Sequence, residues 1–381
     1  MDLPGQEKGF RLRRWYALRR LQITVMQSEW MSRASAQAAA AARIQMGRQS
    51  NMHIRKLAEM EHGKTRSLYE EVFSEDSSSF IDYYYSEKTK DNTIFVVEED
   101  GGIQAMLHLN PYTLMVNGRK EPSHYIVAVA TREKYRKRGY MAGLLKESLR
   151  SMYKEGEPFT FLMPASESIY TPYGFRTVYE QEHRYLTKTE CSGDGIRLAE
   201  EKDCEALAAF AEHALAGRAK VYAERTPAYY RRLLKEYRSD GGNLAIIEED
   251  GKICDLRPIV TEAENEKPKI MVRIVYLKRL LQILELRCLM AACFHVTDPL
   301  IEENNKCFLL TGTEFSGVML MEGKPENSEG VLTVEALGSL IFGSKTVEEI
   351  AAEEGVSMTE RLKGELEKIV PLSPIYLNEI V

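Results

Sequence analysis

From residue 52 onward, apolar and polar positions follow two different periods. Short runs rich in Val and Ile, such as "FVVEEDGGI" at 95–103 and "HYIVAVAT" at 124–131, predict β-strands. Strand-like segments also open at "MHIRKLAEM" (52–60) and at "FTFLMPA" (159–165). Between strands, "MAGLLKESLRSMYKEG" predicts an amphipathic helix, because its apolar residues recur at helical spacing: Leu144, Leu145, Leu149 and Met152. Strands that alternate with helices predict an α/β fold, with α+β organisation where strands follow one another.

One part of this pattern repeats. "AIIEEDGKI" at 245–253 echoes 95–103 at an offset of 150 residues, and in both an Asp-Gly pair between apolar runs predicts a hairpin. Upstream of the hairpins, "IRKLAEME" (54–61) and "IRLAEEKD" (196–203) also match, each a short strand that leads into a helix. A duplicated module explains both matches, and a chance match of common residue types is the alternative. The second copy is shorter, so we expect it to keep the shape and lose the chemistry.

The first 51 residues differ from the rest in charge. They hold nine basic and three acidic residues, and the other 330 hold 42 basic and 54 acidic, a net charge of −12. The segment has no apolar stretch of the kind that a secretory signal needs. It could be a transit peptide, a result of a misassigned start or a non-native extension, so the fold is predicted from residue 52 onward. The acidic remainder disfavours a nucleic-acid partner and favours a cationic one.

The six cysteines include no Cys-x-x-Cys pair, which predicts a reducing compartment, and we expect the cytoplasm. Cys288, Cys293 and His295 in "CLMAACFH" suggest a metal cluster, but the segment is apolar and its spacing fits no zinc pattern. Packing in the core is the favoured interpretation, and no metal is expected. No apolar run reaches the roughly 18 to 20 residues of a membrane span.

The strongest candidate for chemistry is the basic loop "YRKRGYMAGLL" at 135–145. A strand precedes this loop and a helix follows it. The first N–H groups of a helix lack partners, and Gly139 allows close backbone approach, so the loop suits a phosphate. The competing interpretation is the solvated basic start of a surface helix, which is the commoner situation for such a pattern.

"VAVATREKYRKRGYMAGLL" resembles the acetyl-CoA motif of the GNAT superfamily of N-acetyltransferases. Arg136 to Tyr140 match that motif, whereas Met141 replaces the usual small residue. In this respect the sequence resembles the branch of the mycobacterial enhanced intracellular survival (Eis) acetyltransferases, which carry a bulky apolar residue at this position. "ASESIYTPYGF" at 165–175 also resembles a segment of that branch, with one residue fewer before the Ile-Tyr pair.

The resemblance implies a GNAT fold, a degenerate second GNAT-like module and an α+β domain resembling sterol carrier protein. The segments "KIMVRIVYLKRLLQIL" (269–284) and "VLTVEALGSLIFG" (331–343) look like pieces of that third domain. Relatives form trimers and hexamers, which implies a homo-oligomer. The expected division is a basic extension at 1–51, the catalytic domain at 52–190, the second module at 191–268 and the carrier-like domain at 269–381.

The resemblance also implies acetyl-CoA as cosubstrate. The central strand would offer its backbone N–H groups to the thioester carbonyl, and the loop would hold the pyrophosphate. The implied cofactor-binding residues are Val127, Ala128, Val129, Arg136, Lys137, Arg138, Gly139, Tyr140, Met141, Ala142 and Ser166.

Two catalytic groups follow from the same resemblance. Tyr170 matches the tyrosine that protonates the leaving thiolate; a phenol of pKa ~10 can donate to a thiolate of pKa ~8.5. The α-carboxylate of Val381 matches the family's base, and the apolar tail "PLSPIYLNEIV" predicts a docked terminus. For Tyr170 and Tyr173, packing inside the protein is the competing role; it is favoured only for Tyr173.

Together these residues predict an N-acetyltransferase that acts on a polyamine-like or aminoglycoside-like cationic amine. The alternative is a non-catalytic protein that binds acetyl-CoA or an apolar ligand. Tyr83, Tyr84 and Tyr85 in "DYYYSEK" are candidates for an aromatic wall around the ammonium group, and a structural helix face is the competing role.

Overall fold

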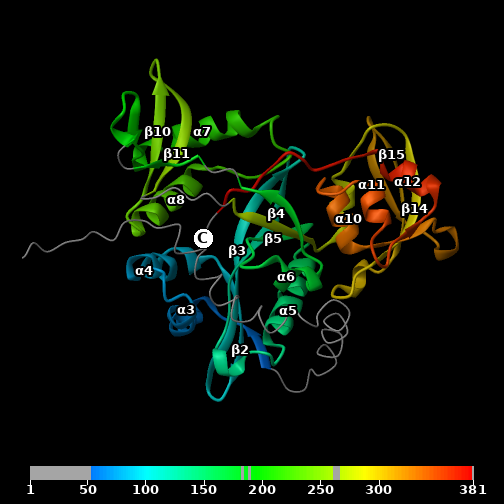
Figure 1. Ribbon diagram of the computed structural model, residues 1–381, viewed down its shortest axis with the longest axis horizontal. Helices are drawn as coiled ribbons and strands as arrows, with labels where there is room; N and C mark the ends of the chain where they lie inside the picture. Colours follow the sequence, from blue (N-terminus) through cyan, green and yellow to red (C-terminus); the bar gives the residue numbers. More distant parts are fainter. Residues whose placement is uncertain (1–52, 182–183, 188–189, 261–266, 380–381) are drawn as a thin grey trace, which may run out of the picture.

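The computed structural model describes residues 53–181, 184–187, 190–260 and 267–379. Figure 1 shows three groups of elements: a central sheet with α3 to α6, a smaller group with β10 and β11, and a third group with β14 and β15. The central group positions the residues that the sequence singles out, and the other two groups flank it.

The central sheet runs in the order β1-β2-β3-β4-β5-β12-β6, with β9 on the far part of β3. Among these strands, neighbours pair antiparallel except for β4 and β5, which are parallel. The strands are β1 (His53–Lys56), β2 (Thr93–Glu99), β3 (Gly102–Val116), β4 (Arg119–Thr131), β5 (Phe159–Leu162), β6 (Arg176–Glu180), β9 (Val221–Ala223) and β12 (Lys269–Ile274).

Both predicted hairpins are confirmed, and they share their turn geometry. The first joins β2 to β3, and the second joins β10 (Asn243–Glu249) to β11 (Lys252–Val260). Asp100 and Gly101 have φ of 53° and 75°, and Asp250 and Gly251 have 50° and 72°. Positive φ at both central residues is what a two-residue hairpin turn requires. In each hairpin the register also shifts between the fifth and sixth residues of the first strand.

Three main helices accompany the central sheet: α3 (Arg66–Val72), α4 (Ser78–Ser86) and α5 (Tyr140–Lys154). The predicted amphipathic helix is α5, which packs on β2, β3 and β4. The four apolar side chains that predicted it, from Leu144 to Met152, are fully buried. A helix start is also set locally at α4, where the Ser77 hydroxyl accepts a hydrogen bond from the Phe80 N–H at 3.1 Å.

The middle group is a four-stranded sheet, β7-β11-β10-β8, with two helices. It contains β7 (Leu186–Thr187), β8 (Ile196–Leu198), α7 (Cys204–Leu215) and α8 (Pro227–Ser239). A small apolar cluster with Leu207, Leu234 and Ile246 forms its core. Between the helices the chain leaves this group, and β9 pairs with β3 of the central sheet. The middle group is therefore joined to the central sheet by backbone hydrogen bonds.

The third group is a five-stranded sheet in the order β16-β15-β14-β17-β18. Its elements are α9 (Leu277–Gln282), β13 (Glu285–Leu286), β14 (Met290–Thr297), β15 (Cys307–Thr313), β16 (Gly317–Glu322), β17 (Gly330–Thr333), α10 (Val334–Ile341), α11 (Val347–Ala351), β18 (Ser357–Met358), α12 (Glu360–Leu366) and β19 (Ile369–Val370).

One strand lies elsewhere than its sequence suggested. Residues 269–274, expected to begin the carrier-like domain, form β12 and pair with β5 and β6 of the central sheet. Apart from Lys269 and Arg273 the strand is apolar, as expected for a strand buried on both faces, and periodicity alone does not identify its partners.

The C-terminal segment returns from the third group to the junction of the other two (Figure 1, red). There β20 (Ile375–Tyr376) pairs in parallel with Val221 and Tyr222 of β9. Glu379, the last described residue, is 2% exposed. Val381, the expected base, lies outside the described residues. No helix within the described ranges is long and apolar enough to cross a membrane.

Candidate active site

The central strands β4 and β5 separate soon after they meet. Their pairing consists of Tyr125 opposite Phe161, and the described residues show no further pairing between them. Beyond this point β4 has a bulge, because Ala128 and Val129 together lie opposite the single residue Leu107. Ala128 has a φ of 50°, uncommon for a residue with a side chain. The strand expected to hold the thioester is therefore open on its β5 side.

The basic loop follows β4 directly and ends at the start of α5. Lys137 and Gly139 have φ of 62° and 86°, and a Cβ at Gly139 would have no atom within 4 Å. The first α-helical bond of α5 is from the Gly143 N–H to the Gly139 carbonyl at 3.0 Å. The N–H groups of residues 140 to 142 thus have no acceptor within the helix and sit at its positive end.

The charges of this loop are arranged around Tyr135. The Tyr135 hydroxyl donates to Asp100 at 2.5 Å, and the Arg138 guanidinium lies 4.8 Å from the centre of the Tyr135 ring. Arg138 also donates to Glu99 at 3.3 Å, and Arg136 donates to the Thr131 carbonyl. Tyr140 is buried, while Met141 and Ala142 are half-buried. Two side chains of the β2–β3 hairpin therefore hold the side chains of Tyr135 and Arg138 in the loop.

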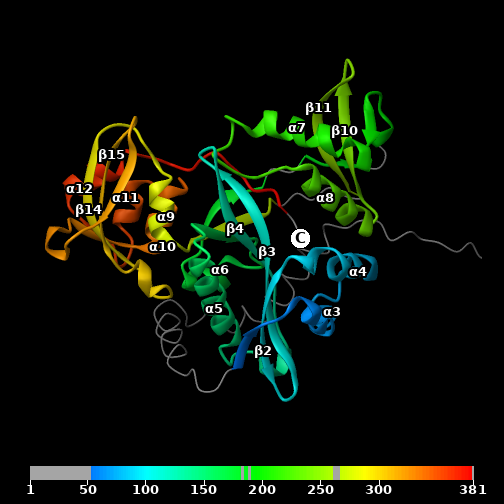
Figure 2. The same ribbon diagram turned by 180° about the vertical axis from the view of Figure 1, so that it is seen from behind.

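Tyr170 is the last residue of α6 (Glu167–Tyr170), a short helix after β5. It is 8% exposed and packs edge-on against Phe175 at 5.8 Å between ring centres. Ser166 precedes the helix, and its hydroxyl lies 2.8 Å from that of Ser168. α6 contacts β6, and both views show it within the central group (Figures 1 and 2). The candidate acid thus follows β5 and the basic loop follows β4, the two strands that separate.

Arg273 of β12 holds the segment that follows Tyr170 in place. The Arg273 guanidinium, 1% exposed, donates to the Tyr173 carbonyl at 2.8 Å and to Asp298 at 2.6 Å. Burial raises the pKa of Tyr173, in keeping with a packing role. Sequence reasoning missed Arg273, because its partners lie 100 and 25 residues away in the chain.

The three tyrosines of α4 face different partners. The Tyr83 hydroxyl donates to Glu236 at 3.1 Å, Tyr84 contacts His108 Nδ1 at 2.9 Å, and Tyr85 contacts Thr65 at 2.9 Å. Burial raises the pKa of all three phenols. None of them lines the cavity described below, so they do not form its wall.

A cavity of about 1020 Å³ lies between β3, the middle group and the C-terminal segment. Its lining includes Asn110 and Tyr112 of β3, Tyr229 of α8 and Glu379. Both polar side-chain atoms of Asn110 are buried without a hydrogen-bond partner in the structure. A volume of this size suits a small-molecule ligand.

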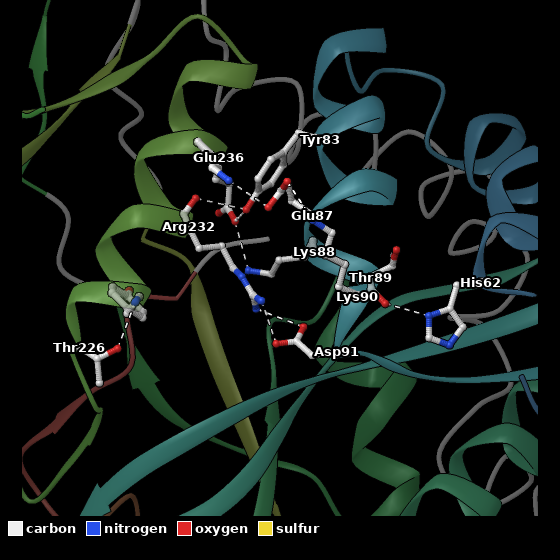
Figure 3. A network of polar contacts seen from close by, with 12 residues as sticks. His62, Tyr83, Glu87, Lys88, Thr89, Lys90, Asp91, Thr226, Arg232 and Glu236 are labelled. Carbon is white, nitrogen blue, oxygen red and sulfur yellow. Dashed lines mark hydrogen bonds and ion pairs between the residues drawn. The ribbon is translucent and has the colours of Figure 1, made fainter. Parts of the chain in front are cut away.

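Ion pairs form part of the cavity lining, and one of the two in Figure 3 is buried. Lys88 Nζ lies 3.1 Å from Glu236 of α8, and the two side chains are 7% and 9% exposed. Beside it, Arg232 of α8 bonds Asp91 at 2.8 Å. These contacts join residues that follow α4 to the middle group.

The end of the C-terminal segment is also paired. Glu379 accepts from Arg225 at 2.7 Å and from the Tyr229 hydroxyl at 3.3 Å, while its Oε2 has no partner in the structure. Burial raises the pKa of the Glu379 carboxyl. Gln181 donates to the carbonyls of Leu377 and Glu379 at 2.9 and 3.2 Å. A buried carboxylate two residues before the expected base is therefore a second candidate.

Two groups of side chains resemble metal sites, but members of both groups already contact another protein side chain. Cys293 lies 3.4 Å from Cys307 between their Sγ atoms, while Cys288 is exposed. The described residues also bring together His124, Glu155 and Glu157. His124 Nδ1 lies 2.6 Å from the Glu157 carboxyl, whose pKa is raised by burial.

Comparisons with known proteins agree with this geometry. Residues 53–178 match the family described as acetyltransferase (GNAT) domain, and residues 282–378 match the sterol carrier protein domain family. No curated protein matches the chain.

Several solved structures share the fold. A probable N-acyltransferase from Enterococcus faecalis V583 is 14% identical, with a TM-score of 0.68 over 84% of this chain and 97% of that one. A GCN5-related N-acetyltransferase from Kribbella flavida is 15% identical, with a TM-score of 0.64 over 86% and 100%. Eis1 from Mycobacterium abscessus is 13% identical, with a TM-score of 0.61 over 83% and 96%. The central group therefore has the GNAT fold, and the third group resembles sterol carrier protein.

Proposed function

Because the chain is an acyltransferase that combines a GNAT acetyltransferase domain with a sterol carrier protein domain, we propose that it transfers acetyl from acetyl-CoA to an acceptor amine. The observation that carries this proposal is the opening between β4 and β5, followed at once by the Gly139 loop. An acyl thioester needs an extended strand for its arm and a separate cradle for its phosphates. The open edge of β4 supplies the strand, and the Gly139 loop, which comes later in the chain, supplies the cradle.

The basic loop would bind the pyrophosphate of acetyl-CoA. The N–H groups at 140 to 142 are aimed outward from the start of α5, and Gly139 leaves space for close approach. Arg136, Lys137 and Arg138 add positive charge around the loop. The thioester carbonyl would then lie along Val127 to Val129, whose backbone N–H groups stabilise the developing oxyanion.

Tyr170 would act as the general acid. When the amine attacks the thioester carbon, a C–N bond forms, the C–S bond breaks, and the sulfur leaves as a thiolate that takes the phenolic proton. The phenol is protonated at neutral pH, so it has a proton to give to the sulfur as the C–S bond breaks; because the thiol is the stronger acid, this transfer is uphill by about 1.5 pKa units, roughly 2 kcal/mol. The position of Tyr170 in the helix that follows β5, the strand that separates from β4, supports this role.

The base would be a carboxylate of the C-terminal segment. The resemblance points to the α-carboxylate of Val381, and the docking of residues 375–379 in the cavity wall supports delivery of the terminus to this region. Glu379 is the competing carboxylate, favoured by its burial and by its unpartnered oxygen. Either group would accept, directly or through water, the proton that the acceptor's ammonium group must lose so that the neutral amine can attack.

The acceptor would occupy the cavity beside the C-terminal segment. Its volume, its position against β3 and its mixed aromatic and charged lining support this assignment. The cavity does not by itself favour the cationic acceptor expected from the net charge, because acids that line it are already paired with basic side chains.

Amine-dependent release of coenzyme A thiol by the full chain tests the proposal, with polyamines, aminoglycosides, amino acids and lysine peptides as acceptors. We expect release above the no-amine blank with at least one acceptor class. Tight binding of acetyl-CoA with no release from any class would favour a non-catalytic, cofactor-binding role. A trimeric or hexameric assembly stays a prediction of the resemblance, which light scattering of the native protein tests. A cytoplasmic location stays a prediction of the cysteine pattern.

A further inference from the structure

The cavity beside the C-terminal segment is not an acidic pocket. Among the described residues, five basic and five acidic side chains line it, so the formal charge of this described lining is zero, although residues 52–381 together carry −12. A site that selects a polycation by charge needs carboxylates that are still free to pair with it. The pairing of each acid therefore decides what the cavity can recognise.

Three of the acids are paired with basic residues of the same lining. Each pair joins different segments of the chain, and two of the pairs are buried. The pairs are Glu236 with Lys88 at 3.1 Å, Glu379 with Arg225 at 2.7 Å, and Asp91 with Arg232 at 2.8 Å.

The other two acids are neutralised from outside the lining. Glu224 lies 2.6 Å from Lys120, and Asp255 lies 2.8 Å from Arg257. Neither of these two cations lines the cavity itself. Each lining carboxylate in the described part of the chain therefore has a cationic partner.

Two of the basic side chains are left over. Arg184 follows β6, and Arg218 follows α7; both are exposed and both line the cavity. Within the described ranges neither guanidinium has a carboxylate partner. The cavity thus presents two uncompensated guanidinium groups and no uncompensated described carboxylate.

We propose that the acceptor carries an oxyanion, a carboxylate or a phosphate, in addition to its amine, and that Arg184 and Arg218 select it. This inference rests on the proposed function, because it takes the cavity as the acceptor site. A guanidinium offers paired N–H donors that match the oxygens of a carboxylate or phosphate. A polyamine would meet these two like charges in the cavity, beside described lining carboxylates that are already paired.

Matched acceptor pairs test the selection. Lysine and cadaverine differ by one carboxylate, and glucosamine 6-phosphate and glucosamine differ by one phosphate, so the two arms also separate the two oxyanions. We expect kcat/KM to be at least about tenfold higher for the acid-bearing member of one pair, equivalent to 1.4 kcal/mol. The advantage should shrink as KCl is added, since exposed charges are screened. Calorimetric titration of the same four compounds measures binding independently of turnover.

The double variant Arg184→Gln/Arg218→Gln should remove the advantage of the acid-bearing acceptor by lowering its kcat/KM, while kcat/KM for cadaverine or glucosamine should not fall, because two like charges are removed. Arg287→Gln is the matched control. It removes an equally exposed guanidinium that lies in the third group, away from the cavity, and should leave the ratio as in the wild type.

The outcomes separate this inference from the proposed function. Turnover with equal or better use of cadaverine and glucosamine would overturn the inference and leave the acetyltransferase intact. Selective binding of an acid-bearing compound, lost in the double variant but without turnover, would support the inference and count against the proposed function. Binding of none of the four compounds would also overturn the inference.

Discussion

Tyr170 differs from the other tyrosines singled out in the sequence by its place in the fold. It ends a short helix beside the opening between β4 and β5, whereas Tyr83 and Tyr84 are held by Glu236 and His108. A general acid contributes typically about 10² to 10⁴-fold to rate. Its role is therefore testable by removing one oxygen atom.

Tyr170→Phe should lower kcat by about 10²-fold or more and leave the dissociation constant of acetyl-CoA nearly unchanged. Tyr173→Phe is the matched control, because Tyr173 is half-buried and three residues away; it should keep full kcat. Steady-state rates and calorimetry give the two quantities. A Tyr170→Phe variant with normal kcat and weakened acetyl-CoA binding would assign this side chain to the cofactor site.

The two carboxylates of the C-terminal segment can be separated by two changes. One glycine added after Val381 moves the α-carboxylate and leaves Glu379 in the chain, while Glu379→Gln removes the buried charge and keeps the length. If the terminus is the base, the added glycine should cut kcat by about 10²-fold or more, with acetyl-CoA binding unchanged. A normal kcat in the extended chain, with a large loss in Glu379→Gln, would transfer the role to Glu379.

His108 predicts a pH dependence of stability. Its ring is fully buried beside Tyr84, its Nε2 has no partner in the structure, and burial lowers its pKa to about 3. Between this value and the unfolded value of ~6.5, the unfolded chain binds a proton that the folded chain does not. The free energy of unfolding should therefore fall as the pH falls from about 6.5 toward 3, by up to about 1.4 kcal/mol per pH unit from this residue.

Denaturant unfolding at several pH values measures this slope. His108→Gln should lower the slope by up to about 1.4 kcal/mol per pH unit, the contribution of one proton. His213→Gln, which removes an exposed imidazole, should leave the slope unchanged. Equal slopes in His108→Gln and wild type would show that His108 takes up its proton normally in the folded protein.

At the scale of elements, the proposed binding of acetyl-CoA can be tested at the start of α5. Gly139 has a φ of 86°, so Gly139→Ala should cost about 1 to 2 kcal/mol of stability. It should also weaken acetyl-CoA binding by about tenfold, because the methyl group enters the space left for the pyrophosphate. Calorimetry measures the affinity.

Gly118→Ala is the matched control for the loop. Gly118 has a φ of 73° in the turn between β3 and β4, and a Cβ there also meets no atom within 4 Å. The strain is the same, but the position is not in the loop, so acetyl-CoA affinity should stay as in the wild type. An equal loss of affinity in both variants would mean that strain, and not the loop, sets the effect.

Elements were predictable where their signals are local. The Asp-Gly turns of both hairpins and the apolar face of α5 are written within a few residues, and the structure contains both hairpins and the helix. The position of β12 was not predictable, because its partners β5 and β6 lie about 100 residues earlier in the chain. The same holds for the cavity pairs: Arg225 and Glu379 are 154 residues apart.

At the scale of the whole molecule, charged contacts join the segment around α4 to α8. Lys88 and Glu236 are buried, whereas the neighbouring pair Lys235 and Glu87 is exposed at 55% and 33%. Removal of one member of a buried pair leaves an uncompensated charge. Lys88→Met should therefore cost about 3 to 5 kcal/mol, and Lys235→Met at most about 1 kcal/mol.

Addition of Glu236→Gln to Lys88→Met should recover a large part of the loss, because the stranded charge is then removed. Denaturant unfolding of the four proteins of this double-mutant cycle measures the coupling. Additive effects of the two changes would mean that the pair does not stabilise the junction of the two groups.

The account as a whole rests on direct transfer of acetyl from acetyl-CoA to an amine bound beside the C-terminal segment. The most direct measurement follows coenzyme A thiol and acetylated acceptor in the same reaction of the full chain, by thiol titration and mass spectrometry. We expect both to appear together in a one-to-one ratio, with no thiol release when the amine is omitted. Thiol release that continues without amine, or that exceeds the acetylated product, would contradict direct transfer and indicate thioester hydrolysis instead.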